Sequence, residues 1–240
     1  MRIANPIYDS VFKHLMEDHE IASGLIARLL GMEVVELTAQ PQEVTTRVAA
    51  GLGYNGQLLR VFRIDFSAVI RLADGTPQKV LIELQKAGRS EAIGRFRNYL
   101  STHYAVQPKD RAPLPIIAIY ILGFSLNSLL PAVTRVRRQY LDAVTGAPVP
   151  LESPEQFIEQ LTHDAVVVQI TEIKEGGQSD LERALRLFDQ HRQDTNPHYL
   201  VIPESPETPP DLLVSKMLRT LLQAGADDPA APRRPARPQR

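Results

Sequence analysis

Residues 62–85 read FRIDFSAVIRLADGTPQKVLIELQ, and their pattern decides the fold. Over 62–72 the even positions are apolar and the odd positions are mostly polar. Such alternation with a period of two is typical of a strand that is buried on one face. Residues 79–85 alternate in the same way, and the Asp74-Gly75 dipeptide between the two runs favours a hairpin turn. The sequence therefore predicts a long antiparallel hairpin.

The turn also predicts the register of this hairpin. If the strands fold back symmetrically about Asp74, then Asp65 lies opposite Glu83 and Arg63 lies opposite Gln85. All four residues occupy odd positions, so they share the face that does not point to the core. Cβ atoms of directly opposite residues are about 5 Å apart. Two carboxylates are therefore expected to converge on one point.

Two carboxylates at this separation repel each other unless a cation lies between them or one of them is protonated. A hard divalent cation, Mg²⁺ (or Mn²⁺), prefers oxygen ligands and keeps bound waters, one of which can be activated to attack a phosphate. The backbone carbonyl of Leu84 would add an oxygen donor beside Glu83. A solvated or salt-bridged pair is the alternative that the hairpin by itself leaves open.

The segments around the hairpin predict the remaining layers. Helical spacing of apolar residues over 6–31 indicates one helix or a helix pair, with Asn5-Pro6 at its start and Gly31 as its stop. The β-branched run at 114–122 is typical of a buried central strand. Further helices are expected over 89–105, over a short segment ending at 161, and over 180–193 and 210–224. Further strands are expected within 33–50 after a break at Gln40-Pro41, over 165–173 and over 198–202. The order predicts an α/β fold, a sandwich with a mixed central β-sheet flanked by helices.

The composition narrows the chemistry. The chain has 240 residues, 43% hydrophobic and 23% charged, which suits one large domain or two small ones. The absence of cysteine excludes thiol nucleophiles, zinc–thiolate sites and disulfides. The formal net charge of −1 gives no global sign of a nucleic-acid or membrane partner, so a site for a polyanion would have to be local.

The ends of the chain carry two further expectations. No signal-like segment is visible at the N-terminus, and the longest apolar run, 114–124, is far short of the roughly 20 residues that span a bilayer. A cytoplasmic protein without a membrane partner is expected. Residues 226–240 are rich in proline and arginine without apolar periodicity, which predicts a disordered tail after a domain over 1–225.

The order of the acidic residues resembles a known superfamily. Asp65, followed eighteen residues later by Glu83-Leu84-Gln85, resembles the PD-(D/E)XK nucleases. It is most similar to their recombination-promoting nuclease (Rpn) or transposase-like branch, in which glutamine replaces the motif lysine. The opening run from Asp9 to Phe12-Lys13 is similar to the D-x-x-F-K start of that branch. The resemblance covers about residues 5–125.

The resemblance implies a restriction-endonuclease-like fold and a Mg²⁺-dependent DNA endonuclease, which hydrolyses phosphodiester bonds in the recombination or transposition of mobile elements. Asp65, Glu83 and the Leu84 carbonyl would hold the metal. Asp9 would add a further acidic ligand or hold Lys13. A homodimer would let two such sites cut two DNA strands.

Gln85 stands at the third motif position, where glutamine cannot supply the positive charge that lysine gives to the phosphate or the attacking water. Lys13 is the favoured replacement, and Arg63 and Lys86 are the alternatives. Activity therefore depends on another cation reaching the carboxylates.

Basic and aromatic residues predict contacts with DNA. Arg95 and Tyr99, on the helix after the hairpin, would contact phosphate or brace Glu83, together with Arg63. The alternative is an exposed pair at i,i+4. The cluster 135–140, RVRRQY, is consistent with binding to the DNA backbone or with a solvated helix face.

Two other functions stay open. A catalytically weak or inactive relative would bind DNA or a protein partner through the same fold, because the motif lysine is missing. A glycoside hydrolase would use the carboxylate pair on a sugar. This last function ranks behind, because tryptophan is absent and only 6% of residues are aromatic.

Overall fold

The computed structural model describes most of the chain. The described residues are 1–39, 62–87, 93–94, 96–97, 100–101, 114–126, 130–150, 158, 162–173, 179–203 and 211–226, without the side chains of 62–65, 83, 85 and 87. The chain forms two compact units, one of Met1–Leu25 with Lys174–Arg240 and one of Ile26–Ile173, and each is described by itself. The single nuclease-like domain over 1–225 remains a prediction, and the predicted tail lies outside the described residues from position 227 onward.

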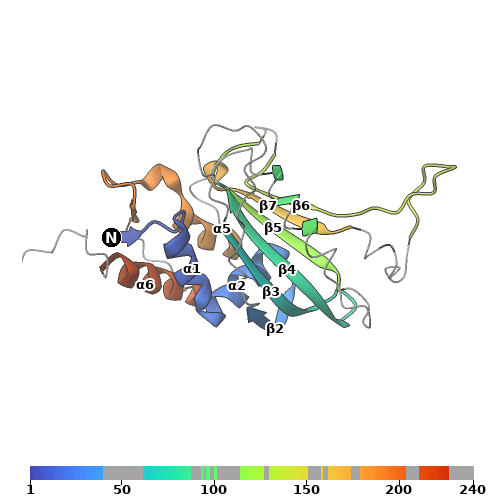
Figure 1. Ribbon diagram of the computed structural model, residues 1–240, viewed down its shortest axis with the longest axis horizontal. Coiled ribbons are helices and arrows are strands. Elements are labelled where there is room, and N and C mark those ends of the chain that lie inside the picture. Colours follow the sequence, from blue (N-terminus) through green and yellow to red (C-terminus); the bar gives the residue numbers. More distant parts are fainter. Residues whose placement is uncertain are drawn as a thin grey trace, which may run out of the picture. The chain divides into compact units, whose positions relative to one another are not determined.

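The larger unit is built on a six-stranded mixed sheet. Its strand order is β2(Glu33–Ala39), β3(Phe62–Arg71), β4(Pro77–Ala87), β5(Ile116–Leu122), β7(Asp164–Gln169) and β6(Val133–Val136). Strands β4, β5 and β7 are parallel, whereas β2, β3 and β6 are antiparallel to their neighbours (Figure 1). The chain is therefore an α/β protein with a mixed central sheet flanked by helices, as the sequence predicts.

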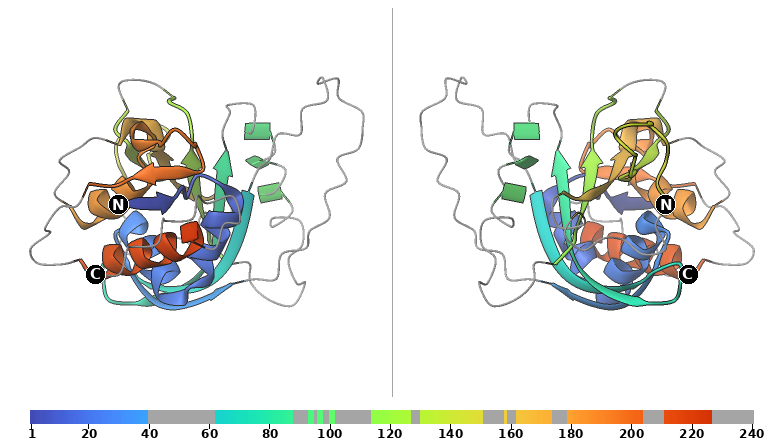
Figure 2. Two further views of the ribbon diagram at one scale, coloured as in Figure 1. Left: turned by 90° about the vertical axis from the view of Figure 1, so that its left-hand side faces the viewer. Right: turned by 90° about the vertical axis from the view of Figure 1, so that its right-hand side faces the viewer.

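The β3–β4 hairpin has the predicted register along its whole length. Its pairs run without a shift from Phe62 opposite Lys86 to Arg71 opposite Pro77, and the two strands curve together as a long teal ribbon (Figure 2). The even positions from 66 to 70 on β3 and from 80 to 84 on β4 are buried, namely Phe66, Ala68, Ile70, Val80, Ile82 and Leu84. This buried stripe explains the register, because a slip by one residue would move every apolar side chain to the other face.

The predicted turn closes the hairpin. Gly75 has φ +85°, a left-handed conformation that glycine adopts without steric cost. The Thr76 backbone N–H donates to Asp74 Oδ1 at 2.9 Å, and the Leu72 N–H donates to the Thr76 carbonyl at 2.9 Å. The side chain and the backbone therefore both fix the position of the turn.

Strand β5 is the predicted central strand. Its register aligns Ile116 with Leu81 on β4, and the Pro115 carbonyl accepts the Leu81 N–H at 2.9 Å. Helical residues between β4 and β5 cover the face of the sheet on which Ile116 and Ala118 lie, and Leu100 packs against these two residues. Phe96 and Leu100 are buried, whereas Ile93 is 60% exposed.

The smaller unit is mostly helical. Its elements are β1(Arg2–Ala4), α1(Asp9–Glu17), α5(Asp180–Leu185), β8(Tyr199–Val201) and α6(Leu212–Ala226), and α2(His19–Leu30) begins in it. The predicted segment 6–31 is therefore a helix pair. The pair separates at Asp18, because Asp18 Oδ1 accepts the N–H groups of Glu20 and Ile21 and caps α2. Lys216 on α6 donates to the same oxygen at 2.8 Å.

The expected cap at Asn5-Pro6 is wrong. Helix α1 begins at Asp9, and Asn5 is fully buried. Its Oδ1 accepts the Ile7 N–H, while its Nδ2 donates to the Pro197 carbonyl at 2.9 Å. Asn5 therefore ties the N-terminal strand to a distant segment instead of starting a helix.

Three expected boundaries also differ. Strand β7 ends at Gln169 and continues as a 3₁₀ turn, Ile170–Glu172, and the helix expected over 180–193 breaks after Leu185 into the 3₁₀ turns Arg186–Phe188 and Gln190–Arg192. Strand β2 precedes the expected break, and the strand expected after it lies outside the described residues. Within the described part of the chain, no helix is long and apolar enough to cross a membrane.

Candidate functional site

The predicted acidic pair occupies opposite backbone positions in the sheet. Asp65 on β3 lies directly across from Glu83 on β4, and Arg63 lies across from Gln85. The four residues are two apart along each strand, so strand alternation assigns all of them to one face. The side chains of these four residues lie outside the described part of the structure, so the convergence of the two carboxylates remains a prediction.

The two residue pairs of the hairpin have neighbours on the next strand, β5. The parallel register of β4 with β5 aligns Glu83 with Ala118 and Gln85 with Tyr120. Ala118 is fully buried, and the half-buried Tyr120 ring packs on Phe96 with 4.9 Å between ring centroids. The acidic row is thus flanked on its β5 side by a small residue, and the glutamine row by an aromatic one.

Lys86 lies on the wrong face to serve this pair. It follows Gln85 on an unbroken strand, and its side chain is buried, with 5% of its surface exposed. Because alternate strand residues point to opposite faces, Lys86 shares the face of Leu84 and Ile82. The register therefore argues against Lys86 as the replacement for the motif lysine.

Asp9 and Lys13 belong to the smaller unit. Asp9 is the first residue of α1, where a carboxylate is favoured by the helix dipole, and Lys13 is exposed one turn later. Residues four apart on a helix share a face. Asp65 and Glu83 belong to the larger unit, so the meeting of Lys13 with them remains a prediction. Arg95 and Tyr99 lie outside the described residues.

The basic cluster at 135–140 is not a helix face. It continues strand β6 in an extended segment, so that alternative is wrong. Arg135 Nε donates to the Leu29 carbonyl at 3.2 Å, and Arg138 Nε donates to Asp164 Oδ1 at 3.1 Å. Arg137 is exposed. Two of the three arginines thus have structural partners within their own unit.

Arg135 also explains why α2 stops where the sequence predicts. Gly31 has φ +62°, and a Cβ atom there would lie 2.5 Å from an Arg135 guanidinium nitrogen. The guanidinium therefore lies over the end of the helix, where a Cβ atom at Gly31 would require it to move, while its Nε donates to the carbonyl of Leu29.

A pocket in the larger unit was not predicted from the sequence. The pocket has a volume of about 470 Å³. Its floor includes Ile70, Val80 and Ile117, and the consecutive residues 137–140 form part of its wall. Ile70 and Val80 belong to the buried even face, opposite to the face of Asp65 and Glu83. The pocket is therefore separate from the predicted acidic site.

A cluster of polar side chains at the ends of β5 and β7 was also not predicted from the sequence. Ser125 Oγ lies 2.9 Å from Thr171 Oγ1 and donates to the Glu172 carboxylate. The buried Gln169 accepts the Leu126 N–H at 2.7 Å and donates to the Pro131 carbonyl. These bonds tie the loop after β5 to β7. Among the described side chains, no group of three His, Asp or Glu residues is arranged to hold a metal.

Comparisons of the chain with models of protein families, with curated proteins and with solved structures find no match in any of the three.

Proposed function

We propose that the protein is a Mg²⁺-dependent DNA endonuclease that hydrolyses phosphodiester bonds in the recombination or transposition of mobile elements. In this proposal the fold is a restriction-endonuclease-like sandwich of the PD-(D/E)XK type. One observation carries the proposal: Asp65 lies opposite Glu83 in the register of a continuous hairpin. That register gives the two acidic motif residues neighbouring positions without any assumption about distant parts of the chain.

The donor set suits a hard divalent cation. Asp65 and Glu83 would hold Mg²⁺ (or Mn²⁺) through carboxylate oxygens, the ligands that such ions prefer. Leu84 is a weaker candidate, because strands lie on both sides of it and pair it with Ile64 and Ile119. Its carbonyl points along the plane of the sheet, and only its second lone pair is available to a metal. When bound, the cation would lower the pKa of a water and neutralise phosphate charge.

The other motif residues have roles that follow from their charge. Gln85 would orient the attacking water or the phosphate by hydrogen bonds but adds no charge. Lys13 would supply that charge. Arg63 is the alternative, because it lies directly opposite Gln85 in the hairpin. Arg95 and Tyr99 would contact DNA phosphate. Asp9 would hold Lys13 or add a metal ligand.

A second function, binding of DNA or of a protein without efficient cleavage, is favoured by the neutral Gln85 at the position of the motif lysine. Gln85 aligns with the aromatic Tyr120 on β5, and the described buried lysine next to it, Lys86, belongs to the opposite face. Along this part of the hairpin, Arg63 is therefore the remaining cation that the register assigns to the face of Gln85.

The proposal is tested by cleavage of supercoiled plasmid. The full chain should nick or linearise DNA with Mg²⁺ and stop in EDTA. Asp65→Asn and Glu83→Gln should each lose about a hundredfold or more in rate, because even outer-shell changes at metal sites cost 10–100-fold. Glu36→Gln, which changes an exposed carboxylate on β2, is the matched control and should leave the rate unchanged. Cleavage that survives both site substitutions overturns the proposed site.

A gain of function separates the two candidates. Gln85→Lys restores the motif lysine and should raise the cleavage rate by about tenfold or more if the protein is a weakened nuclease, since one well-placed donor is worth at least that much. A binding protein would show salt-dependent DNA affinity and no cleavage in either form. Circular dichroism of Gln85→Lys confirms that the sheet has formed.

A further inference from the structure

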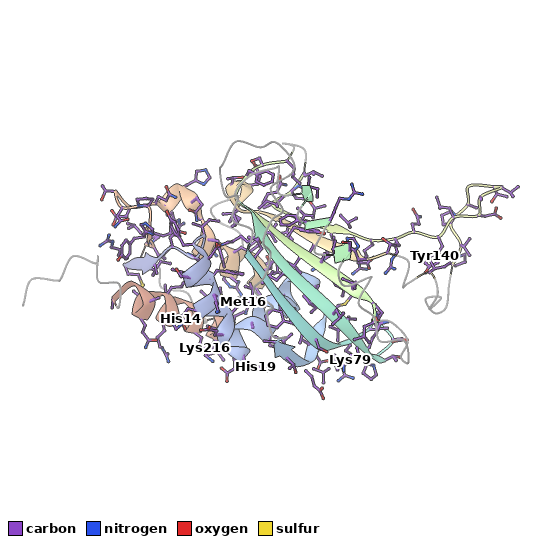
Figure 3. All side chains as sticks on the ribbon, viewed as in Figure 1. His14, Met16, His19, Lys79, Tyr140 and Lys216 are labelled. Carbon is purple, nitrogen blue, oxygen red and sulfur yellow. The ribbon has the colours of Figure 1, made fainter. Side chains whose placement is uncertain are left out.

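A two-stranded ribbon follows strand β6, and we call residues 137–150 the arm. A bridge pairs Leu141 with Pro148, and the Val149 N–H donates to the Tyr140 carbonyl at 2.9 Å. The Gly146 N–H donates to the Asp142 carbonyl at 2.8 Å and closes the tip. The yellow-green ribbon extends away from the sheet in Figure 1, and Figure 3 labels Tyr140 on it.

The arm has a defined backbone but leaves the apolar side chains near its tip largely exposed. Val144 is 94% exposed and Leu141 53% exposed. A two-stranded ribbon without a hydrophobic face to pack is marginal in water. Apolar side chains grouped on a projecting element are typical of a contact surface. The tip is therefore suited to insertion into another surface.

A receptor of matching chemistry lies at the base of the arm itself. The pocket of about 470 Å³ combines an apolar floor on β3, β4 and β5 with wall residues from the arm, including Arg137 and Tyr140. Arg138 in the wall is paired with Asp164, so these two charges cancel. The exposed Arg137 leaves the pocket with a net positive charge. An apolar segment with one negative charge would fit it best.

The tip of the arm has that composition. Asp142 is the only charged residue between Gln139 and Pro150, and Leu141 precedes it directly, while Val144 follows two residues later. We propose that the arm tip of one copy of this chain occupies the pocket of a second copy, and the reverse. Because the base of the arm lines the pocket, one twofold axis satisfies both contacts, which is the usual symmetry of homodimers. Leu141 and Val144 of one copy would pack on the apolar floor of the other copy's pocket, and Asp142 would face Arg137 there.

A nucleic-acid partner suits the tip less well. Binding to a phosphate backbone depends on lysine and arginine charges, and the single charge at the tip is acidic. The occupant of the pocket is therefore a second protein copy. This inference does not depend on the proposed nuclease activity, and its test uses no DNA cleavage.

The first experiment is sedimentation velocity of the full chain over a concentration series. The wild type should sediment as a dimer, and Val144→Asp as a folded monomer, because Val144 is exposed in the single chain and its replacement costs the monomer little. Val35→Asp, at another exposed valine of the same unit, is the matched control and should remain dimeric. The proposal is overturned if the wild type is monomeric at every concentration, if it dimerises only when duplex DNA is added, or if Val144→Asp dimerises like the wild type.

The second experiment tests the contact directly. The chain contains no cysteine, so single-cysteine variants report one position each. A mixture of Val144→Cys with Gln78→Cys, which places the thiol in the pocket, should form a cross-linked heterodimer under mild oxidation. Val35→Cys mixed with Gln78→Cys should not. Equal cross-linking in the two mixtures, or none in the first, contradicts insertion of the tip.

Discussion

The β3–β4 hairpin and the arm are two antiparallel ribbons with similar turns and opposite surroundings. In the hairpin, Asp74 Oδ1 accepts a backbone N–H two residues on at 2.9 Å, and in the arm Asp142 Oδ1 does so at 2.7 Å. Each turn contains a glycine with positive φ, Gly75 at +85° and Gly146 at +71°. The turn chemistry is therefore nearly the same in both ribbons.

The strands that follow the turns differ. The hairpin pairs without interruption from Arg71 back to Phe62 and buries one face, whereas the arm has a single bridge at Leu141 and exposes its tip. The difference shows that a turn starts a ribbon but burial of alternate side chains extends it. The hairpin is thus part of the folding core, and the arm is free to serve as a contact.

The largest expected effect is on the free energy of unfolding when one apolar side chain is truncated in each ribbon. Phe66→Ala in the hairpin should lower the free energy of unfolding by about 3–5 kcal/mol, because it leaves a cavity in the core. Val144→Ala in the arm should change it by no more than about 0.5 kcal/mol. Urea denaturation at low protein concentration measures both. A cost for Val144→Ala comparable to that of Phe66→Ala would mean that the arm belongs to the folding core.

The two turn glycines offer a finer comparison. A Cβ atom at Gly75 or Gly146 would meet nothing within 4 Å, so the cost of alanine is that of the left-handed backbone alone, about 1 kcal/mol. Gly75→Ala should lower the free energy of unfolding by that amount. Gly146→Ala should leave global unfolding unchanged and speed hydrogen exchange at the Asp142 and Ala147 amides, which bond within the arm. Equal losses in urea would remove the distinction between the ribbons.

Gly31 provides the control for these substitutions. It also has positive φ, but a Cβ there would collide with the Arg135 guanidinium. Gly31→Ala should therefore cost more than Gly75→Ala in the same urea experiment, and Arg135→Ala should relieve part of that extra cost. A cost for Gly31→Ala equal to that of Gly75→Ala would show that the Arg135 contact contributes nothing.

The smallest expected effect is on pH dependence. The Thr76 backbone N–H and hydroxyl hold the pKa of Asp74 below its usual range, and the N–H groups of Val144 and Thr145 lower the pKa of Asp142. A lowered pKa in the folded state stabilises the fold above the unfolded pKa of about 3.9, and this contribution is lost as the pH falls through the folded pKa.

Acid should therefore weaken global stability through Asp74 but only local order of the arm through Asp142. Carboxyl carbon NMR titration reports each pKa, and urea denaturation from neutral to acid pH reports stability. Asp74→Asn keeps an acceptor oxygen and should flatten the acid side of the stability profile slightly, whereas Asp142→Asn should not change it. The reverse pattern would contradict the comparison.

The sequence predicted what local periodicity determines. The hairpin register followed from alternation and one turn, and the opposite positions of Asp65 and Glu83 followed from the register. The place of β5 followed from an apolar run too short for a helix. Asn5 could not be predicted, because its partner Pro197 is far along the chain. The arm could not be predicted either, because its exposed side chains follow no burial pattern.

Calorimetric titration of Mg²⁺ and Mn²⁺ into the full chain tests the central claim, that Asp65 and Glu83 form one cation site, most directly. The wild type and the control Glu36→Gln should bind the cation with equal affinity, and Asp65→Asn and Glu83→Gln should each abolish the binding heat. Affinity that is the same in all four proteins, or absent from the wild type, would contradict the claim.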